Sequence, residues 1–423
     1  MPQLKILISG AGIAGTALAF WLSKLGHSVT VVERFPELRK NGLQLDLRGH
    51  GVQVLKLMGL DAEFRARAAP EQGMQIVNKS GKRVAYFPVN KSGKGVQTLT
   101  SEYEIMRVEL SRLFYDAAKD KVNYVFGTSI SDMSKTESSV HVNFANGSTD
   151  AFDLVVGADG QWSRTRSMML DADAPDPMKM LLNTYFAYFT VPQPISDGEG
   201  YDCTLYMAGK SRGIMTRRSN PDEMQIYLSC YSAGEAFKNV HRGNIDEEKA
   251  AFVESMQGAG WKTEEFLKGM QESTDFYCER IGLVKMPSWS KGRVALVGDA
   301  AYCPSVMTGM GTTSGVVGAY ILAGEIGNHC GRADGSEAKV TDEAMKQALD
   351  AYEAKFRPFM DQVQKGVGED SFGSMPSSAF GIAVFSGFLR VLSFFGVDMF
   401  SRSFLKEAVK DWTLPEYKEL LGA

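Results

Sequence analysis

The stretch at residues 4–34 reads LKILISGAGIAGTALAFWLSKLGHSVTVVER, and its pattern decides the first part of the fold. An apolar run at 4–9 predicts a strand, residues 14–25 have the apolar spacing of a helix, and an apolar run at 28–32 predicts a second strand. Three glycines between the first strand and the helix form a GxGxxG pattern: Gly10, Gly12 and Gly15. This order predicts a Rossmann-like unit that binds a dinucleotide.

Each part of this unit has a physical reason. Gly10 allows the tight turn, Gly12 lets a pyrophosphate approach the backbone, and Gly15 lets the helix pack closely on the strand. Glu33 follows the second strand, where a carboxylate accepts hydrogen bonds from a ribose diol, so FAD or NAD is favoured over NADP at this place. A tight turn without a ligand is the alternative, and the complete order of parts argues against it.

The composition is that of an ordinary globular protein. The 423 residues can form two domains, with 44% hydrophobic and 23% charged residues. A net charge of −4 gives no reason to expect nucleic acid as a partner. The five cysteines and five histidines are scattered, which argues against a disulfide framework and a metal site. Because the first residues also lack the pattern of a secretory signal, we expect a cytoplasmic protein.

Two later stretches each place a glycine-rich turn after a strand. DLVVGADGQWSRTR, at 153–166, reads as an apolar strand that ends in Gly-Ala-Asp-Gly before a helix. GRVALVGDAAYCPSVMTGMG, at 292–311, reads as a strand that leads into Asp299 and then into a helix of small residues. Such a helix start offers free backbone N–H groups and the positive end of the helix dipole, so we expect an electron-rich or negative group beside it.

In these three stretches, and in their order, the sequence resembles the group A flavin monooxygenases of the para-hydroxybenzoate hydroxylase superfamily. It is similar in particular to the tetracycline-inactivating flavin monooxygenases, through NGLQLDLRGHG at 41–51, YEIMRVEL at 103–110 and GAYILAGE at 318–325. The resemblance implies FAD as the cofactor and NADPH or NADH as a transient reductant. It also implies an α/β fold, in which a Rossmann-like FAD-binding domain is joined to an antiparallel-sheet substrate domain and to C-terminal bridging helices.

The resemblance implies roles for single residues near the cofactor. Glu33 would bind the adenosine ribose, and Arg107 would reach the FAD pyrophosphate or ribityl chain. Asp299 would bind ribityl hydroxyls. Asp159 would help to hold FAD and assist the cofactor that reduces it. Asp46 would lie beside the flavin.

The loop after the second strand and the third glycine turn complete the expected cofactor site. Arg39 would approach the flavin or the nicotinamide cofactor, while Gly311, Thr312 and Thr313 would present N–H groups to the O2/N1 edge of the flavin. Thr313 and Gly318 depart from the amide and acid that many members of the superfamily have there, which puts in doubt how tightly Thr313 contacts the ring. The full predicted set is Gly10, Gly12, Ala14, Gly15, Glu33, Arg34, Arg39, Asp46, Arg107, Asp159, Asp299, Pro304, Gly311, Thr312 and Thr313.

We expect three structural units. Residues 1–180 and 287–370 would form a discontinuous FAD-binding domain, residues 181–286 a substrate-binding domain, and residues 371–423 the C-terminal helices. Alternating Tyr, Phe and Met in the second unit indicate an antiparallel sheet with one face toward a cavity. Candidate substrate contacts there are Tyr185, Tyr206, Met215 and Tyr227, although each of these residue types is more often plain core.

The most apolar stretch, residues 377–400, is long enough to raise the question of a membrane span. Arg390 and several Gly and Ser residues interrupt it, so a buried helix pair that covers the core is the favoured interpretation, with membrane contact as the alternative.

The sequence therefore predicts an FAD-dependent, NAD(P)H-consuming monooxygenase without catalytic side chains of its own. Oxygen would form a flavin C4a-(hydro)peroxide, and one oxygen atom would pass to an aromatic or polycyclic small molecule, in natural-product biosynthesis or antibiotic inactivation. A flavin oxidase or dehydrogenase without oxygen insertion is the alternative. Flavin-dependent halogenation is disfavoured because no WxWxIP-like stretch follows the motifs, and a non-catalytic flavin-holding protein remains a further alternative. A monomer and a homodimer are equally compatible with the sequence.

Overall fold

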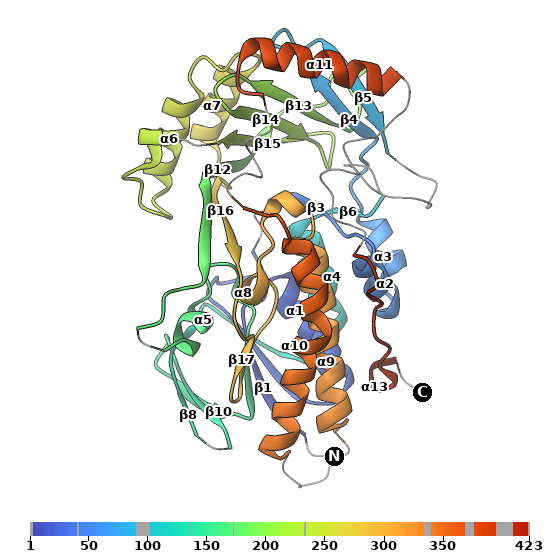
Figure 1. Cartoon of the computed structure of the whole chain (residues 1–423), viewed down its shortest axis with the longest axis vertical. Coiled ribbons are helices and arrows are strands. Elements are labelled where there is room, and N and C mark those ends of the chain that lie inside the picture. The colour runs from blue at the N-terminus through green and yellow to red at the C-terminus, as the bar shows by residue number, and fades with distance from the viewer. Residues whose placement is uncertain are drawn as a thin grey trace.

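The computed structural model describes residues 3–39, 42–89, 102–136, 138–171, 173–231, 234–333, 340–368, 376–394 and 409–421. The molecule is elongated, with a lower lobe that contains both termini and an upper lobe built on a large sheet (Figure 1). A small antiparallel pair lies between the two lobes, formed by β3 (Gln44–Asp46) and β6 (Glu104–Met106).

The lower lobe is built on a six-stranded sheet. Its central strands are parallel, as the sequence pattern predicted, and only the first edge strand is antiparallel to its neighbour. The strands in spatial order are β17 (Ser290–Lys291), β18 (Val294–Leu296), β11 (Leu154–Gly157), β1 (Lys5–Ser9), β2 (Ser28–Glu33) and β7 (Asn123–Phe126). Strands from all three glycine-rich stretches are therefore neighbours, and their carboxyl ends meet at one edge of the sheet.

Helices and a small second sheet cover the six-stranded sheet. Helix α9 is buried along almost its whole length between α1, α2 and α10 (Figure 1). The small sheet contains a hairpin that turns at Asn146–Gly147, where Gly147 has a φ of 84°. The helices are α1 (Ile13–Lys24), α2 (His50–Leu57), α3 (Asp61–Ala66), α4 (Arg107–Ala118), α5 (Arg164–Met169), α8 (Asp299–Tyr302), α9 (Gly311–Cys330), α10 (Asp342–Gln364) and α13 (Lys418–Leu421), and the small sheet is β8 (Ile130–Lys135), β9 (Val140–Phe144) and β10 (Thr149–Phe152).

The upper lobe is a seven-stranded sheet that is mostly antiparallel. Its order is β16 (Tyr277–Val284), β12 (Met178–Pro192), β15 (Glu223–Cys230), β14 (Arg212–Arg217), β13 (Asp202–Ala208), β4 (Gly73–Val77) and β5 (Arg83–Pro88). The last two strands come from the segment that the predicted boundaries placed in the first domain, and β4 pairs in parallel with β13. We therefore propose that residues 73–88 belong with the second unit.

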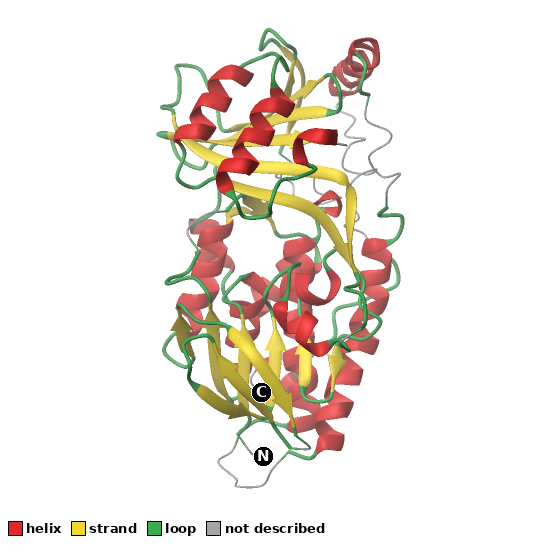
Figure 2. Cartoon of the chain, turned by 90° about the vertical axis from the view of Figure 1, so that its left-hand side faces the viewer, coloured by secondary structure: helices red, strands yellow, loops and turns green. Residues whose placement is uncertain are grey.

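The two faces of this large sheet have different covers. Helices α6 (Ile245–Met256) and α7 (Thr263–Glu272) cover one face, and Figure 2 shows them in front of the strands. On the opposite face, the part formed by β12 and β15 faces β3 and the lower lobe. The part of this face formed by β4 and β5 is covered by α11 (Ala379–Phe394). Strand alternation assigns each side chain to one of these two faces.

The C-terminal segment touches both lobes. Helix α11 packs on β5 in the upper lobe, whereas Tyr417 and Leu420 are buried against the lower lobe near α9. The first part of the predicted stretch forms α11, which is not buried as expected because several of its apolar side chains are exposed. The end of the predicted stretch, where the second helix of the pair was expected, lies outside the described residues. Among the described helices, none is long and apolar enough to cross a membrane.

Candidate active site

The starts of α1 and α9 converge on one place. A Cβ added at Gly298 would lie 2.8 Å from the Cβ of Ala14, and one added at Gly315 would lie 3.5 Å from it. Ala14 in the first turn of α1 thus packs between the strand end before Asp299 and the first turns of α9. Both glycine-lined helix starts therefore face a shared region, as one bound dinucleotide requires.

Open space lies where a cofactor would approach the backbone. A Cβ added at Gly12, the residue before α1, or at Gly311, the first residue of α9, would meet no other atom within 4 Å. The two glycines therefore leave the N–H groups of both helix starts accessible, and the residues present fit a pyrophosphate at α1 and an electron-rich ring edge at α9.

Gly10 and Gly15 hold the first turn together. Gly10 has a φ of 108°, and a Cβ there would lie 2.7 Å from the carbonyl oxygen of Ala158, so the first and second glycine-rich stretches are in direct contact. A Cβ on Gly15 would overlap the carbonyl oxygen of Gly10. Only glycine lets α1 approach the strand this closely.

Glu33 lies at the turn where the sequence predicted it. Its carboxylate accepts hydrogen bonds from the backbone N–H of Ala11 at 2.9 Å and of Phe35 at 3.1 Å. The acid is therefore fixed beside the glycine turn, in position to receive a ribose diol. Arg34 is exposed, and its guanidinium lies 4.8 Å from the ring centre of Phe35.

The carboxylate of Asp159 accepts hydrogen bonds from residues of the loop that follows it. Ser163 donates its hydroxyl to one carboxylate oxygen at 2.5 Å, and the backbone N–H and hydroxyl of Thr165 donate to the other at 3.0 Å. The carboxylate thus stabilises the turn into α5. The structure gives it this positioning role, which the resemblance did not anticipate.

Charged residues gather where the two lobes meet. Burial raises the pKa of Asp299, and the positive charge of Arg107 lowers it in part. Burial, and then the nearby charge of Arg107, lowers the pKa of Arg39. The guanidinium of Arg39 lies 4.2 Å from the ring centre of Tyr277. Arg39, Arg107 and Asp299, predicted from distant parts of the chain, therefore belong to one electrostatic site.

Glu279 on β16 belongs to the same site and was not among the predicted residues. It accepts hydrogen bonds from the hydroxyl of Tyr277 and the side-chain amide of Gln161. Burial raises its pKa to about 7, while Tyr277 and Arg107 act in the opposite direction. No sequence motif marks this acid, because only the pairing of β16 with β12 brings it to the place where the two lobes meet.

The loop after β3 contacts the start of α9. The backbone N–H of Arg48 donates to the hydroxyl of Thr313 at 2.9 Å, so this hydroxyl contacts the protein's own loop. Arg48 forms an ion pair with Asp46, and burial raises the pKa of Asp46. Thr312 is half-buried at the helix start, and Pro304 is buried.

A buried ionic cluster lies under the β3–β6 pair and was not predicted. Arg217 on β14 donates to Glu104 on β6 at 2.7 Å and lies 3.6 Å from Glu71. The side-chain amide of Gln44 donates to both carboxylates. Burial raises the pKa of Glu71 well above its usual value; Arg217 lowers it in part, and Glu104 raises it further. The cluster joins strands of the upper sheet to the segment that faces the cofactor region.

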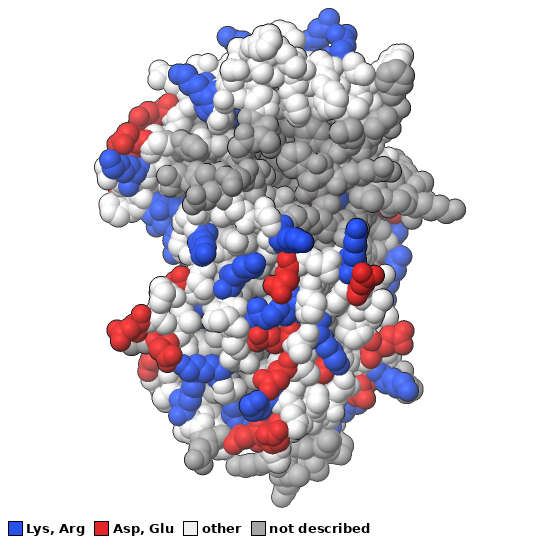
Figure 3. All heavy atoms as spheres, in the orientation of Figure 1, with Lys and Arg blue, Asp and Glu red and all other residues white. Residues whose placement is uncertain are grey.

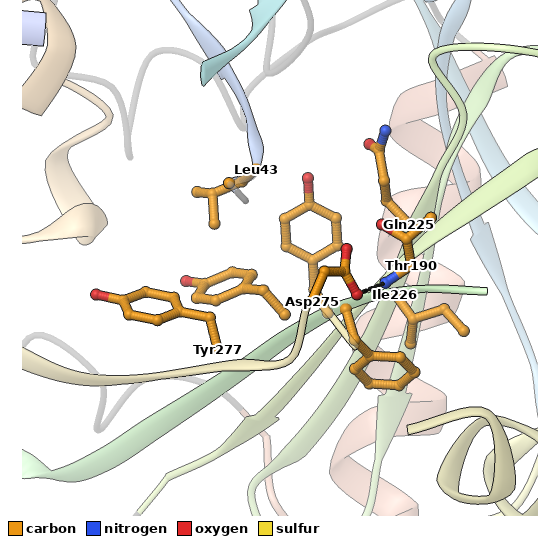
Figure 4. Close-up of a pocket in the computed structure, with 10 residues that line it drawn as sticks. Leu43, Thr190, Gln225, Ile226, Asp275 and Tyr277 are labelled. Atoms are coloured by element: carbon orange, nitrogen blue, oxygen red, sulfur yellow. Dashed lines mark hydrogen bonds between the residues drawn. The ribbon is translucent and has the colours of Figure 1, made fainter. Parts of the chain in front are cut away.

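A small pocket lies between residues 42–43 and the upper sheet. Figure 4 shows Leu43 above it, Tyr277 on one side, and Asp275 accepting a hydrogen bond from the backbone N–H of Thr190 at 3.0 Å. Tyr188 lies between the rings of Tyr227 and Tyr277, with ring centres 5.2 and 6.2 Å away. Three phenol rings therefore form one aromatic wall of the pocket.

The four predicted substrate residues divide between the two faces of the sheet. Tyr227 lines the pocket, and its hydroxyl accepts a hydrogen bond from the backbone N–H of Gln44 at 3.1 Å. Met215 pairs with Tyr227 across the sheet and shares its face. Tyr185, by contrast, stacks on Phe237 under the helices, and Tyr206 donates to the carbonyl of Ala259 there.

This division changes the candidate set. Tyr185 and Tyr206 lie in the core between the sheet and its helices, and their side chains face away from the pocket. We therefore propose Tyr188 and Tyr277 in their place, because both line the pocket with Tyr227.

Comparison with known proteins agrees with this geometry. A family model described as an FAD binding domain matches residues 3–366. The FAD-dependent monooxygenase asL4 of Sarocladium schorii is 49% identical over 428 residues, covering 100% of both chains. The flavin-dependent monooxygenase eupH of a Phoma species is 41% identical over 376 residues, covering 85% of both. The structure of the tetracycline destructase Tet(55) matches with a TM-score of 0.77 and 28% identity, over 99% of this chain and 100% of that one.

The chain belongs to the FAD-binding monooxygenases and is an enzyme that uses FAD. The predicted family, fold class and flavin cofactor are thereby confirmed.

Proposed function

We propose that this FAD-dependent monooxygenase transfers one atom of O2 to an aromatic or polycyclic small molecule, with NADPH or NADH as the transient reductant. The reaction would convert substrate C–H, O2, NAD(P)H and a proton into substrate C–OH, water and NAD(P)⁺. Bound FAD would supply the activation of oxygen. The observation that carries the proposal is the aromatic wall of Tyr188, Tyr227 and Tyr277 beside the half-buried guanidinium of Arg39 and carboxyl group of Glu279.

The chain's own residues would bind and orient the substrate and exclude water. Flat aromatic substrates stack on phenol rings, and the buried wall keeps water from the reacting atoms. The hydroxyl of Tyr277 donates a hydrogen bond to the carboxyl group of Glu279 within the site. A phenolic substrate that lies against this aromatic wall would therefore meet a hydroxyl whose proton is already oriented away from it.

The biological role follows from the same chemistry. We place the substrate among phenolic or polycyclic natural products, either in their biosynthesis or in the inactivation of tetracycline-like antibiotics. The identity with asL4 and eupH supports the first role, and the likeness to Tet(55) supports the second.

The test is oxidation of NADPH and NADH against a panel of phenolic and tetracyclic compounds under ¹⁸O2, followed by mass spectrometry of the products. The proposal expects substrate-stimulated NAD(P)H consumption and one labelled oxygen atom in the product. The alternative is an oxidase or dehydrogenase without oxygen insertion, and a product that loses hydrogen and gains no label would establish it instead.

A further inference from the structure

The surface of α11 that faces away from the sheet has no part in the site described above. The inner side of α11 packs on β4 and β5, with Leu389 fully buried against Ile76 and Phe87. Ser393 fixes the end of the helix, because its hydroxyl bonds to both the backbone N–H and the carbonyl of Tyr86. Apolar packing and the hydrogen bonds of Ser393 therefore hold α11 on the sheet (Figure 1).

A row of apolar side chains runs along the outer side of this helix. Phe380 is 80% exposed, Val384 57%, Phe388 48% and Val391 55%. Their spacing of four, four and three residues places them on one face of the helix. The outer row consists of these four residues. Phe394, which is 85% exposed, ends the same helix, and the other large exposed apolar residues among those described lie on other elements, so α11 carries the aligned apolar patch.

Positive charges lie on the segments next to the outer row, and the acid on the strands beside α11 is Asp202 at the start of β13, which accepts a hydrogen bond from the hydroxyl of Tyr86 at 3.1 Å. Residues 73–89, 203–218 and 376–394 have no Asp or Glu. Their exposed cations are Lys82, Arg83, Lys210 and Arg390, together with Lys79, whose side chain lies beside Gly260 in the loop between α6 and α7. Lys210 lies at the start of the helix, where its backbone N–H donates to the carbonyl of Ser377 at 2.9 Å. Figure 3 shows uncharged atoms across the top of the molecule with Lys and Arg at their edge.

The charge pattern distinguishes between occupants of this face. A second copy docked by two-fold symmetry would bring the same cations together, which is unfavourable. Anionic lipid headgroups accept Lys and Arg, while their acyl region accepts the apolar row. Because no described helix can cross a bilayer, the helix would lie in the plane of the membrane surface.

We propose that the outer row of α11 and its surrounding cations bind the surface of a bilayer that contains anionic lipids. The face of the sheet under α11 is the one that also carries Met215 and Tyr227, since Leu205 pairs with Met215 and Met215 with Tyr227. Membrane contact would therefore occur on the pocket's side of the upper lobe, where apolar substrates that partition into lipid are concentrated.

The test is co-sedimentation of the FAD-loaded protein with vesicles of phosphatidylcholine alone or with about one quarter phosphatidylserine. The key variant is Phe380→Ser/Val384→Ser/Phe388→Ser. The matched control is Ile245→Ser/Val253→Ser, which removes exposed apolar residues from α6. We expect the wild type and the control to bind the anionic vesicles and to be released by salt, and the outer-row variant to bind about tenfold more weakly or less.

A second variant tests the charges. In Lys82→Gln/Arg83→Gln/Lys210→Gln, each lost cation is expected to weaken vesicle binding about fivefold, with the flavin absorbance and melting temperature unchanged. The proposal is overturned if the wild type does not bind anionic vesicles, or if the outer-row variant binds as well as the wild type. It is also overturned if light scattering shows a wild-type dimer that the outer-row variant converts to a monomer without any vesicle binding, because the occupant is then a second copy.

Discussion

The two helix starts in the lower lobe and the pocket face of the upper sheet present different chemical groups. The starts of α1 and α9 offer backbone N–H groups, and glycines keep them open. The pocket face is made of side chains, with phenol rings and buried charges from strands that are distant in sequence. The comparison teaches that the first site depends on where a Cβ is absent, and the second on which charges and rings are paired.

The largest expected effect comes from adding a single Cβ to the first site. Gly15→Ala would place a methyl group on the carbonyl oxygen of Gly10, so we expect a loss of stability of about 3 kcal/mol or more and little bound flavin. The matched control is Gly12→Ala, where the space is open, and it should fold normally while binding FAD about tenfold more weakly. Thermal melting and flavin absorbance measure both. Equal stability of the two variants would break the comparison.

The second effect concerns pairing in the upper lobe. Arg217→Met leaves the buried carboxylates of Glu71 and Glu104 without their guanidinium, and we expect a loss of about 3 kcal/mol at neutral pH. Arg67→Met is the control, because Arg67 pairs with Glu109 and Asp116 at the partly exposed surface and should cost about 1 kcal/mol or less. Denaturant unfolding of both variants checks this, and similar losses would show that the cluster does not stabilise the lobe.

The third effect is a pH dependence. The ordinary pKa of a glutamate is 4.5, and that of Glu279 in the folded protein is about 7. Between these values the folded protein keeps a proton that the unfolded chain has lost. Stability of the deflavinated protein therefore falls as pH rises through this window, by up to about 3 kcal/mol. Glu279→Gln should remove this slope, and parallel pH–stability curves for the variant and the wild type would contradict it.

The smallest effect distinguishes the two faces of the upper sheet. Tyr227→Phe leaves the buried N–H of Gln44 without its acceptor, with an expected loss of about 1 kcal/mol and a raised KM. Tyr185→Phe keeps the ring that stacks on Phe237, so KM should stay unchanged. Steady-state kinetics with a substrate from the panel checks the pair, and a raised KM for Tyr185→Phe alone would reverse our assignment of the faces.

The sequence predicted the lower lobe well, because its information is local. A strand, a glycine turn, a helix and an acid occur within about thirty residues, and each residue type follows from the backbone geometry that a dinucleotide needs. The same holds for Asp299 and Gly311, which lie close together in the chain. Asp159 shows the limit of this reasoning, because the motif did not reveal that its carboxylate is bound by Ser163 and Thr165.

The upper lobe depends on pairings between distant segments, and there the sequence was less informative. The period-two alternation of a strand places the side chain of Tyr185 on the opposite face of the sheet from that of the next residue. It does not indicate which of the two faces the helices cover. Nothing local indicates that β4 joins β13 in parallel, or that Glu104 and Arg217 meet. Glu279 was missed for the same reason, since its partners come from β16 itself and from the loop after β11.

The central claim is that the starts of α1 and α9 hold one FAD in a shared region, with its reactive ring toward the phenol wall. The most direct test is an experimental structure of the protein with FAD bound. We expect the ribose diol at Glu33, the pyrophosphate at the backbone N–H groups near Gly12, and the O2/N1 edge of the flavin at Gly311. A structure in which the FAD avoids either helix start, or in which its ring lies away from Tyr188, Tyr227 and Tyr277, would contradict the account.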